Sequence, residues 1–287
     1  KFLTALSAAC TSGYAKEIMK PLGIKAKVAL ATSLTSIAMI ALVTMIQVKH
    51  MRDDFTQVLL SQQTALIERT ADELDDKLAM LLDIITQTAR HQPPTLMADP
   101  AQLREYYTQR AMLALFDDVL VLDTQGKVVA NVPEVQGRNG TDVAYRGYFQ
   151  TVMRTKQAMI TEPMLGKTSH LPIVQMVAPV LDRNGEVAGI VIGVLRLYKD
   201  NMLGHLRTAK VGKSGYYFIL TREAVPRYVL YPDASRLLQP RAPNANPVTT
   251  QLLKEDGEGS MVSTNSRGVT AVNSFKRLKS VNWLLAA

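Results

Sequence analysis

A run of twenty-one uncharged residues, from Val28 to Val48, constrains the fold of this chain more than any other feature. At the rise of an α-helix it covers about 30 Å, which is the thickness of the hydrocarbon core of a bilayer. That length favours a transmembrane helix over a buried helix or the apolar part of a signal peptide. A cleaved signal peptide is the alternative, but no clear small-x-small cleavage site precedes the charged segment VKHMRDDF. We therefore expect a retained span over residues 28–48.

The charges beside this run predict its orientation. Residues 1–27 contain five lysines against Glu17 alone, a net charge of +4, whereas the other flank mixes both signs. The positive-inside rule then places residues 1–27 in the cytoplasm and everything after His50 outside the membrane. We expect a bacterial inner membrane protein whose larger part is periplasmic. The chain opens on Lys, and Met19 begins a stretch that resembles a natural start, so residues 1–18 are interpreted as foreign to it.

Residues 49–92 are predicted to form a long helix that ends before Pro93 and Pro94, because proline cannot continue a helix. Apolar residues recur in it at alternating spacings of three and four. This seam suits a coiled coil in a homodimer, or a single helix that packs on the sheet of its own domain, and the sequence leaves both open. The seam consists of Ile67, Ala71, Leu74, Leu78, Leu81, Ile85 and Thr88.

Two similar ten-residue segments predict an antiparallel sheet. VLDTQGKVVA begins at Val121 and VLDRNGEVAG at Val180, and in each an apolar run meets Asp, then two polar residues, then Gly. Asp can bond its own turn backbone and Gly supplies a positive φ, so each segment is typical of a β-hairpin. With the helices expected after Asp99 and around residues 144–155, residues 93–200 predict an α+β unit. Residues 201–287 predict a second unit of strands that ends in the apolar segment VNWLLAA.

Several functions are disfavoured by what the sequence contains. Cys10 is the only cysteine, so no intrachain disulfide can form, and the four histidines are scattered without metal-ligand spacing. No esterase elbow, phosphate-binding loop or His-Glu-x-x-His motif occurs, so we expect this chain itself to have no catalytic residues, no metal and no cofactor. Residues 204–287 carry a net charge of +7, which favours contact with anionic lipid over nucleic acid, since no aromatic-basic recognition motif accompanies it. An ordinary solvated surface is the common alternative.

Taken in order, these segments resemble the double Cache sensor regions of bacterial receptors. The resemblance rests on VLDTQGKVVA, AYRGYFQ, ITEPMLGKTSHLPIVQMVAPVLDRNGEVAGIVIGVLRL, VGKSGYYFILT with YPD, and FKRLKSVNWLLAA. It implies two PAS-like antiparallel-sheet modules behind a long signalling helix, with residues 93–200 as the membrane-distal module and residues 201–287 as the membrane-proximal one. It also implies that the chain senses a small molecule in the distal module.

The resemblance also suggests site residues. Amino-acid-binding members grip the ligand carboxylate with an Arg-x-Trp-Tyr segment, which Arg146, Tyr148 and Phe149 match in altered form, and bind the ammonium with an Asp on the last strand. Val194 stands at that Asp position, so a carboxylate or other anion without an amine, or an uncharged molecule, fits better. A structural salt bridge of Arg146 with Glu162 or Asp118 is the competing interpretation. The expected ligand-binding residues are Tyr145, Arg146, Tyr148, Phe149, Met164, Lys167, Ser169 and Val194, with Thr168 on the same loop as Lys167.

Four short segments are most similar in sequence to the branch of the family that controls a diguanylate cyclase: AYRGYFQ, ITEPMLGKTS, NPV and FKRLKSVNWLLAA. A C-terminal GGDEF domain beyond this chain is therefore expected. The alternatives are the sensor region of a histidine kinase or of a chemoreceptor, and a membrane-tethered solute-binding protein without an output domain.

Overall fold

The structure, a computed structural model, describes residues 23–109, 114–199, 201, 203–242, 249–251, 253, 257–264 and 268–287. Its contacts divide the chain into two units, residues 1–59 and residues 60–287. Helix α1 (Ile24–His91) begins in the first unit and ends in the second. It runs without a break through residues 48 and 49, where the sequence suggested that the span gives way to the long helix.

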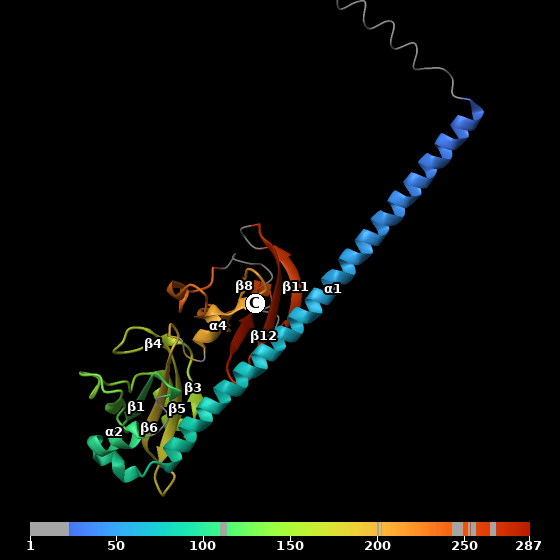
Figure 1. Ribbon diagram of the computed structural model, residues 1–287. Helices are drawn as coiled ribbons and strands as arrows, with labels where there is room; N and C mark the ends of the chain where they lie inside the picture. Colours follow the sequence, from blue (N-terminus) through green and yellow to red (C-terminus); the bar gives the residue numbers. More distant parts are fainter. Residues whose placement is uncertain are drawn as a thin grey trace, which may run out of the picture. The chain divides into compact units, whose positions relative to one another are not determined.

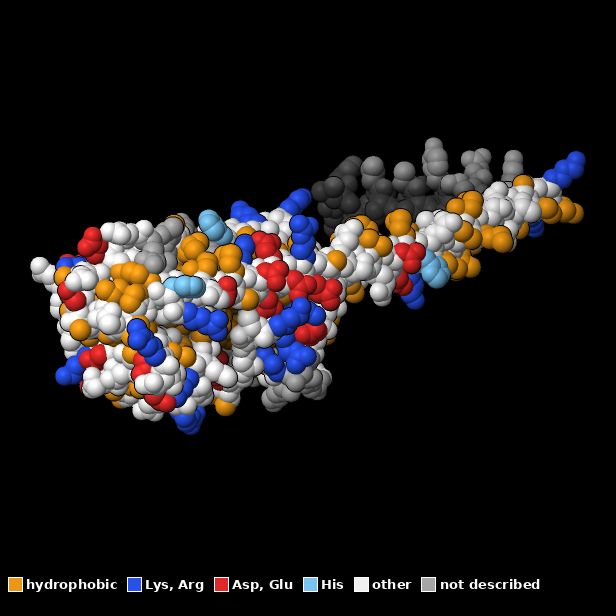
Figure 2. All heavy atoms as spheres, turned by 90° about the horizontal axis from the view of Figure 1, so that it is seen from below, with side chains coloured by type: hydrophobic (Ala, Val, Ile, Leu, Met, Phe, Trp, Pro, Cys, Tyr) orange, Lys and Arg blue, Asp and Glu red, His pale blue; other side chains and the backbone are white. Residues whose placement is uncertain are grey.

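The N-terminal half of α1 exposes its apolar side chains. An 18-residue window in it has a mean hydropathy of 2.0 and none of it is buried, so α1 is long and apolar enough to cross a membrane. Figure 2 shows hydrophobic side chains, in orange, along the exposed part of the helix. Hydroxyls in this half are satisfied within the helix, since the side chains of Thr32 and Thr44 donate to Val28 O and Ile40 O at 3.0 and 2.8 Å. Internal bonding of this kind suits a hydrocarbon environment, where no water replaces the missing partner.

The first sheet is antiparallel and has six strands in the order β2-β1-β6-β5-β3, with β4 also paired to β5 (Figure 1). The strands are β1 (Asp118–Leu122), β2 (Val128–Val132), β3 (Met159–Ile160), β4 (Met164–Leu165), β5 (Pro172–Leu181) and β6 (Val187–Arg196). Both predicted hairpins are confirmed as β1–β2 and β5–β6. Their turns have the same chemistry, because the carboxylates of Asp123 and Asp182 each accept two backbone N–H groups of their own turn.

The second sheet is antiparallel and has five strands in the order β10-β9-β13-β12-β11. The strands are β9 (Phe218–Thr221), β10 (Tyr228–Leu230), β11 (Gly259–Thr264), β12 (Thr270–Arg277) and β13 (Trp283–Ala286). The apolar end of the chain forms β13, whose residues are all buried between β9 and β12. The segment is apolar throughout because both faces of the strand are covered: Trp283 and Leu285 belong to the cluster with the α1 seam, and Leu284 and Ala286 to a second cluster with Phe275. A small ribbon of β7 (Lys210–Val211) and β8 (Gly215–Tyr216) precedes it.

Short helices precede or connect these strands. Within the described residues they include η1 (Pro94–Ala98) and α2 (Pro100–Thr108) before β1, and α3 (Gly147–Thr155), α4 (Gly204–Thr208) and η3 (Ala234–Arg236) between strands. The predicted start of α2 is confirmed, because the side chain of Asp99 accepts from the backbone N–H groups of Ala101 and Gln102. The end of α1 at His91, before the two prolines, is confirmed as well. The mixed α+β class with two antiparallel sheets is therefore as the sequence predicts.

The seam of α1 packs on the sheets of its own chain. Its residues from Ile67 to Ile85 are at most 2% exposed and belong to one hydrophobic cluster with Val174 and Met176 of the first sheet and Ile219 and Trp283 of the second. Thr88, expected in the seam, is only half-buried, and Ala89 is buried instead. The residues of the seam from Ile67 to Ile85 therefore pack on the chain's own sheets, which is the second of the two interpretations that their spacing left open, and not in a coiled coil.

Candidate functional site

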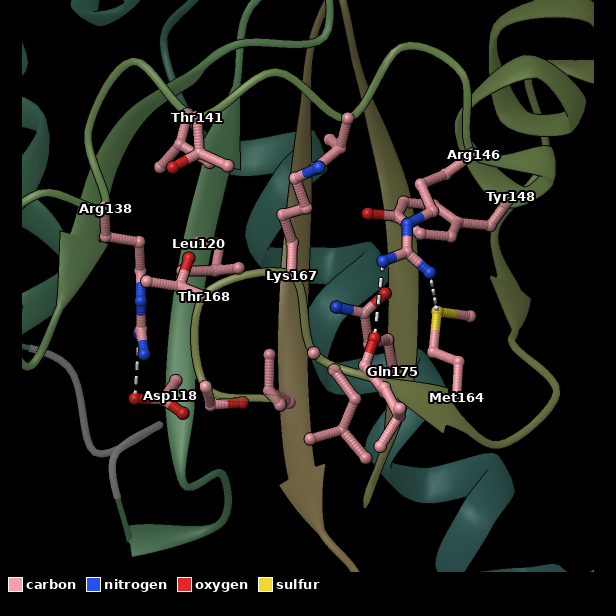
Figure 3. Close-up of a pocket in the computed structure, with 17 residues that line it drawn as sticks. Asp118, Leu120, Arg138, Thr141, Arg146, Tyr148, Met164, Lys167, Thr168 and Gln175 are labelled. Atoms are coloured by element: carbon pink, nitrogen blue, oxygen red, sulfur yellow. Dashed lines mark hydrogen bonds and ion pairs between the residues drawn. The ribbon is translucent and has the colours of Figure 1, made fainter. Parts of the chain in front are cut away.

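A cavity of about 50 Å³ lies on one face of the first sheet (Figure 3). Its floor comes from β1, β5 and β6, and its walls come from the loop after β2, the start of α3 and the loop after β4. Three floor residues form a row across adjacent strands, since Val194 pairs with Asp118 on β1 and with Gln175 on β5. Residues directly opposite in an antiparallel pair point to the same face, so the three side chains share the floor.

Arg146 reaches the cavity from the N-cap position of α3. Its Nη2 donates to Leu165 O at 3.4 Å, its Nη1 lies 3.8 Å from Met164 Sδ, and its guanidinium stacks 5.4 Å from the ring centre of Tyr145. Among the described residues no carboxylate lies within salt-bridge distance of it. The predicted alternatives for its partner are wrong: Asp118 binds other arginines, and Glu162 accepts from Trp283.

The other expected site residues divide into two groups. Tyr148, Met164, Lys167, Ser169 and Val194 line the cavity together with Arg146 and Thr168. Burial raises the pKa of Tyr148 to about 12, against the opposing effect of the Arg146 charge, so its phenol stays neutral and can donate. Tyr145 and Phe149 do not line it. Phe149 is buried in the cluster beneath α3, and Tyr145 is exposed, with the ammonium of Lys167 lying 5.1 Å from its ring centre.

Four polar lining residues were not anticipated as ligand contacts: Asp118, Arg138, Thr141 and Gln175. Asp118, Arg138 and Gln175 are buried, and Thr141 is half-buried. Gln175 interrupts the apolar strand PIVQMVAPV, and a lone polar residue in a buried strand is the signal that would have identified it. Arg138 and Asp118 are distant in sequence and meet only through the loop after β2, so no local pattern points to them.

Asp118 is saturated by two arginines. Its Oδ1 accepts from Arg138 Nη1 at 3.1 Å and from Arg196 Nη2 at 2.9 Å, and its Oδ2 accepts from Arg196 Nε and Nη2 at 3.1 and 2.7 Å. A carboxylate offers about four lone-pair sites, and these bonds use all of them. Its neighbour Asp117 points elsewhere, as expected of adjacent strand residues, and accepts from the backbone N–H of Arg196.

The lining is therefore electropositive. Arg138, Arg146 and Lys167 face a single acidic residue, Asp118, which is already paired. Figure 3 shows Arg138 with Asp118 on one side of the cavity and Arg146 with Met164 and Gln175 on the other. A low-dielectric cavity with excess positive charge favours an anion. Within the described residues no group of three His, Cys, Asp or Glu side chains could hold a metal ion.

A hydrogen bond links the connection between β3 and β4 to the second sheet. The indole Nε1 of Trp283, on β13, donates to Glu162 Oε2 at 2.9 Å, and Glu162 lies between β3 and β4, next to the lining residues of β4. Burial raises the pKa of Glu162 above its ordinary value; the Trp283 hydrogen bond and Arg227 oppose this effect, while Glu223 adds to it.

We expect Glu162→Gln to make thermal stability less dependent on pH. The folded protein holds the proton of Glu162 more tightly than the unfolded chain, so this group's contribution to stability falls as the pH rises above the ordinary value of 4.5. A glutamine keeps an acceptor for Trp283 but cannot ionise. Unfolding temperatures of both proteins between about pH 4 and pH 7 should therefore diverge in favour of the variant. Exposed Glu105→Gln is the control, and parallel curves for Glu162→Gln and wild type would contradict the prediction.

Comparisons with known proteins place these features in context. Residues 46–287 match the dCache_1 family, described as a Cache domain. The methyl-accepting chemotaxis protein McpG of Pseudomonas putida is 22% identical over an alignment of 276 positions, which covers 93% of this chain and 40% of that protein. The chain thus spans about 40% of the length of this curated relative.

Solved structures share the fold. The ligand-binding domain of the Pseudomonas fluorescens chemoreceptor CtaA, in complex with L-serine, has a TM-score of 0.62 at 21% identity, covering 80% of this chain and 96% of that one. The ligand-binding domain of the Pseudomonas aeruginosa amino acid chemoreceptor PctC, in complex with GABA, has a TM-score of 0.60 at 18% identity, covering 79% and 97%. These relatives are chemoreceptors, and the comparisons lend no support to the expected diguanylate cyclase output.

Proposed function

This chain belongs to the dCache_1 family of Cache domains, and from that premise we propose that it is the ligand-sensing region of a bacterial membrane chemoreceptor. Its ligand is a small anion, and a carboxylate is favoured. Arg146 carries this proposal, because its guanidinium lies at the cavity with two weak neutral contacts and no carboxylate among the described residues. A guanidinium offers paired donors that match a carboxylate, and such charge-assisted bonds are stronger than those it makes here.

The membrane topology follows from α1. The exposed apolar window supports a span through the inner membrane over residues 28–48, with residues 1–27 in the cytoplasm and the two sheets in the periplasm. On this arrangement residues 93–200 form the membrane-distal module, which contains the cavity, and residues 201–287 form the membrane-proximal module. The net positive charge of the proximal module suits a surface near anionic lipid headgroups.

A homodimer through α1 would use a face other than the seam from Ile67 to Ile85, which its own sheets cover. Met51, Phe55 and Val58 remain 67%, 64% and 51% exposed, and their spacings of four and three match the heptad pattern. Ligand binding would then shift a two-state dimer whose helices carry the change through the membrane.

The anion proposal is tested by thermal unfolding of the 287-residue chain in detergent micelles, against acetate, propionate, succinate, alanine, putrescine and glucose. We expect a carboxylate to stabilise the chain and Arg146→Ala to weaken its binding by a factor of about ten to one hundred, the effect of losing a charged hydrogen-bond partner. Arg183→Ala, which removes an exposed arginine from the turn between β5 and β6, is the control. Carboxylate binding that survives in Arg146→Ala would remove the basis of the proposal.

The output is tested separately, by reading the encoded sequence that follows residue 287. A second apolar span and a methyl-accepting signalling domain would support the chemoreceptor. A GGDEF domain would instead show that the chain is the sensor region of a diguanylate cyclase. A histidine kinase domain would show that it is the sensor region of a histidine kinase.

A further inference from the structure

We propose that the ligand of the first-sheet cavity carries an uncharged hydrogen-bond donor beside its carboxylate, and that Oε1 of Gln175 accepts from that donor. The ligand class is then a small hydroxycarboxylate, and an amino acid with a charged ammonium is rejected. This inference rests on the proposed function and specifies the chemistry of the same cavity.

The side-chain oxygen of Gln175 is a hydrogen-bond acceptor to which no described residue donates. The residue is 4% exposed, and its Oε1 is buried without a hydrogen-bond partner among the described residues. Its backbone is satisfied independently, since its N–H donates to Thr161 Oγ1 at 3.1 Å. A buried carbonyl oxygen that accepts nothing is unfavourable, because it has given up its hydration without replacing it. The amide lines the cavity, so a bound molecule is positioned to supply the missing donor.

The placement of Gln175 relative to Arg146 suits a donor close to a carboxylate. Figure 3 shows the two side chains on the same side of the cavity, away from Arg138 and Asp118. A carboxylate held by Arg146 would place the neighbouring carbon of the ligand toward the floor, where Gln175 lies next to Val194. A hydroxyl on that carbon can donate to Oε1 and carries no charge.

An ammonium has no anionic acceptor here. Val194 has no polar atom in its side chain, and its row neighbour Asp118 already accepts four hydrogen bonds from Arg138 and Arg196. The nearby cations Arg138, Arg146 and Lys167 would repel a further positive charge. A neutral amide oxygen alone does not offset that repulsion, so the cavity discriminates a hydroxyl from an ammonium on otherwise identical skeletons.

The test uses matched triplets that differ in one substituent: glycolate, acetate and glycine; L-lactate, propionate and L-alanine; L-malate, succinate and L-aspartate. Binding to the whole chain in micelles is measured by isothermal titration calorimetry. In at least one triplet we expect the hydroxy acid to bind at least tenfold more tightly than the plain acid, because the plain acid has no donor for Oε1 of Gln175. In the same triplet the amino acid should bind most weakly.

Two variants assign the discrimination to Gln175. Gln175→Leu should bring the hydroxy acid and the plain acid to within about twofold of each other, because the acceptor is gone. Gln175→Glu places an anion at the same point and should raise affinity for the amino acid at least tenfold. Gln136→Leu, an exposed substitution in the loop after β2, is the control and should leave the order of the wild-type affinities unchanged.

The outcomes separate the two proposals. An amino acid that binds best to the wild type, or a plain acid that matches its hydroxy acid, overturns the inference about Gln175 while leaving anion sensing through Arg146 intact. The second of these results would mean that the amide donates its N–H to the carboxylate. If no acid in any triplet binds, anion sensing itself fails and the inference fails with it. The wild-type triplets alone decide the matter if either Gln175 variant does not fold.

Discussion

Asp75→Ala is expected to lower the free energy of unfolding by about 3 kcal/mol, because it removes the carboxylate that fastens α1 to the second sheet. Asp75 is 7% exposed and accepts from the backbone N–H groups of Lys279 and Ser280 at 2.8–2.9 Å and from the Ser280 hydroxyl at 2.6 Å. Those groups form the connection between β12 and β13, so the variant leaves buried donors unpaired at a contact between segments about 200 positions apart in the sequence.

The neighbouring Asp76 provides the matched control for this substitution. It is exposed on the same helix, so Asp76→Ala removes an equal charge and should change stability by about 0.5 kcal/mol or less. Urea titrations of the chain in micelles, followed by circular dichroism and by the fluorescence of Trp283, the only tryptophan, measure both variants. Equal effects of the two substitutions would show that charge on the helix, and not the bonds to Lys279 and Ser280, matters.

Asp118→Asn is expected to cost about 3–5 kcal/mol, the usual effect of removing one partner from a buried ion pair. The side chain of Asp118 is 5% exposed, and those of its partners Arg138 and Arg196 are 9% and 20% exposed. An asparagine of the same shape leaves two guanidinium groups with little solvent and without the carboxylate charge that pairs them. The same urea titrations measure the loss, with exposed Asp83→Asn on α1 as the control.

A second substitution separates charge from shape in this cluster. Arg196→Met in the Asp118→Asn background removes one of the uncompensated cations, so the double variant should recover part of the lost stability. If the double variant is less stable by the sum of the two single losses, the three charged groups act independently. The buried ion-pair account of Asp118 would then be wrong.

Local chemistry accounts for what could be predicted about the fold. The two Asp-x-x-Gly turns, the Asp99 cap and the end of α1 at the prolines each depend on residues within a few positions of one another. Arg146 was suggested instead by the resemblance of the segment AYRGYFQ to double Cache sensor regions. Hydrogen bonds and φ preferences over such short distances are encoded in the order of residues alone.

The partner of the α1 seam could not be predicted, because a coiled coil and a sheet surface present the same demand for apolar residues at spacings of three and four. Only the tertiary structure shows that Ile67, Leu78 and Ile85 pack on the chain's own sheets. Figure 1 shows how widely separated segments supply those sheets, with the end of the chain as a middle strand of the second.

The sequence by itself determined the long apolar helix, the hairpins and the α+β class, and its resemblance to double Cache regions indicated the family and the arginine at the edge of the cavity. Tertiary structure alone decided what surrounds that arginine. The pairing of β1, β6 and β5 sets Asp118, Val194 and Gln175 in one row, and the loop after β2 brings Arg138 to Asp118. Sheet register fixes such neighbours, and register depends on long-range pairing and on burial of a whole face, which no local pattern encodes.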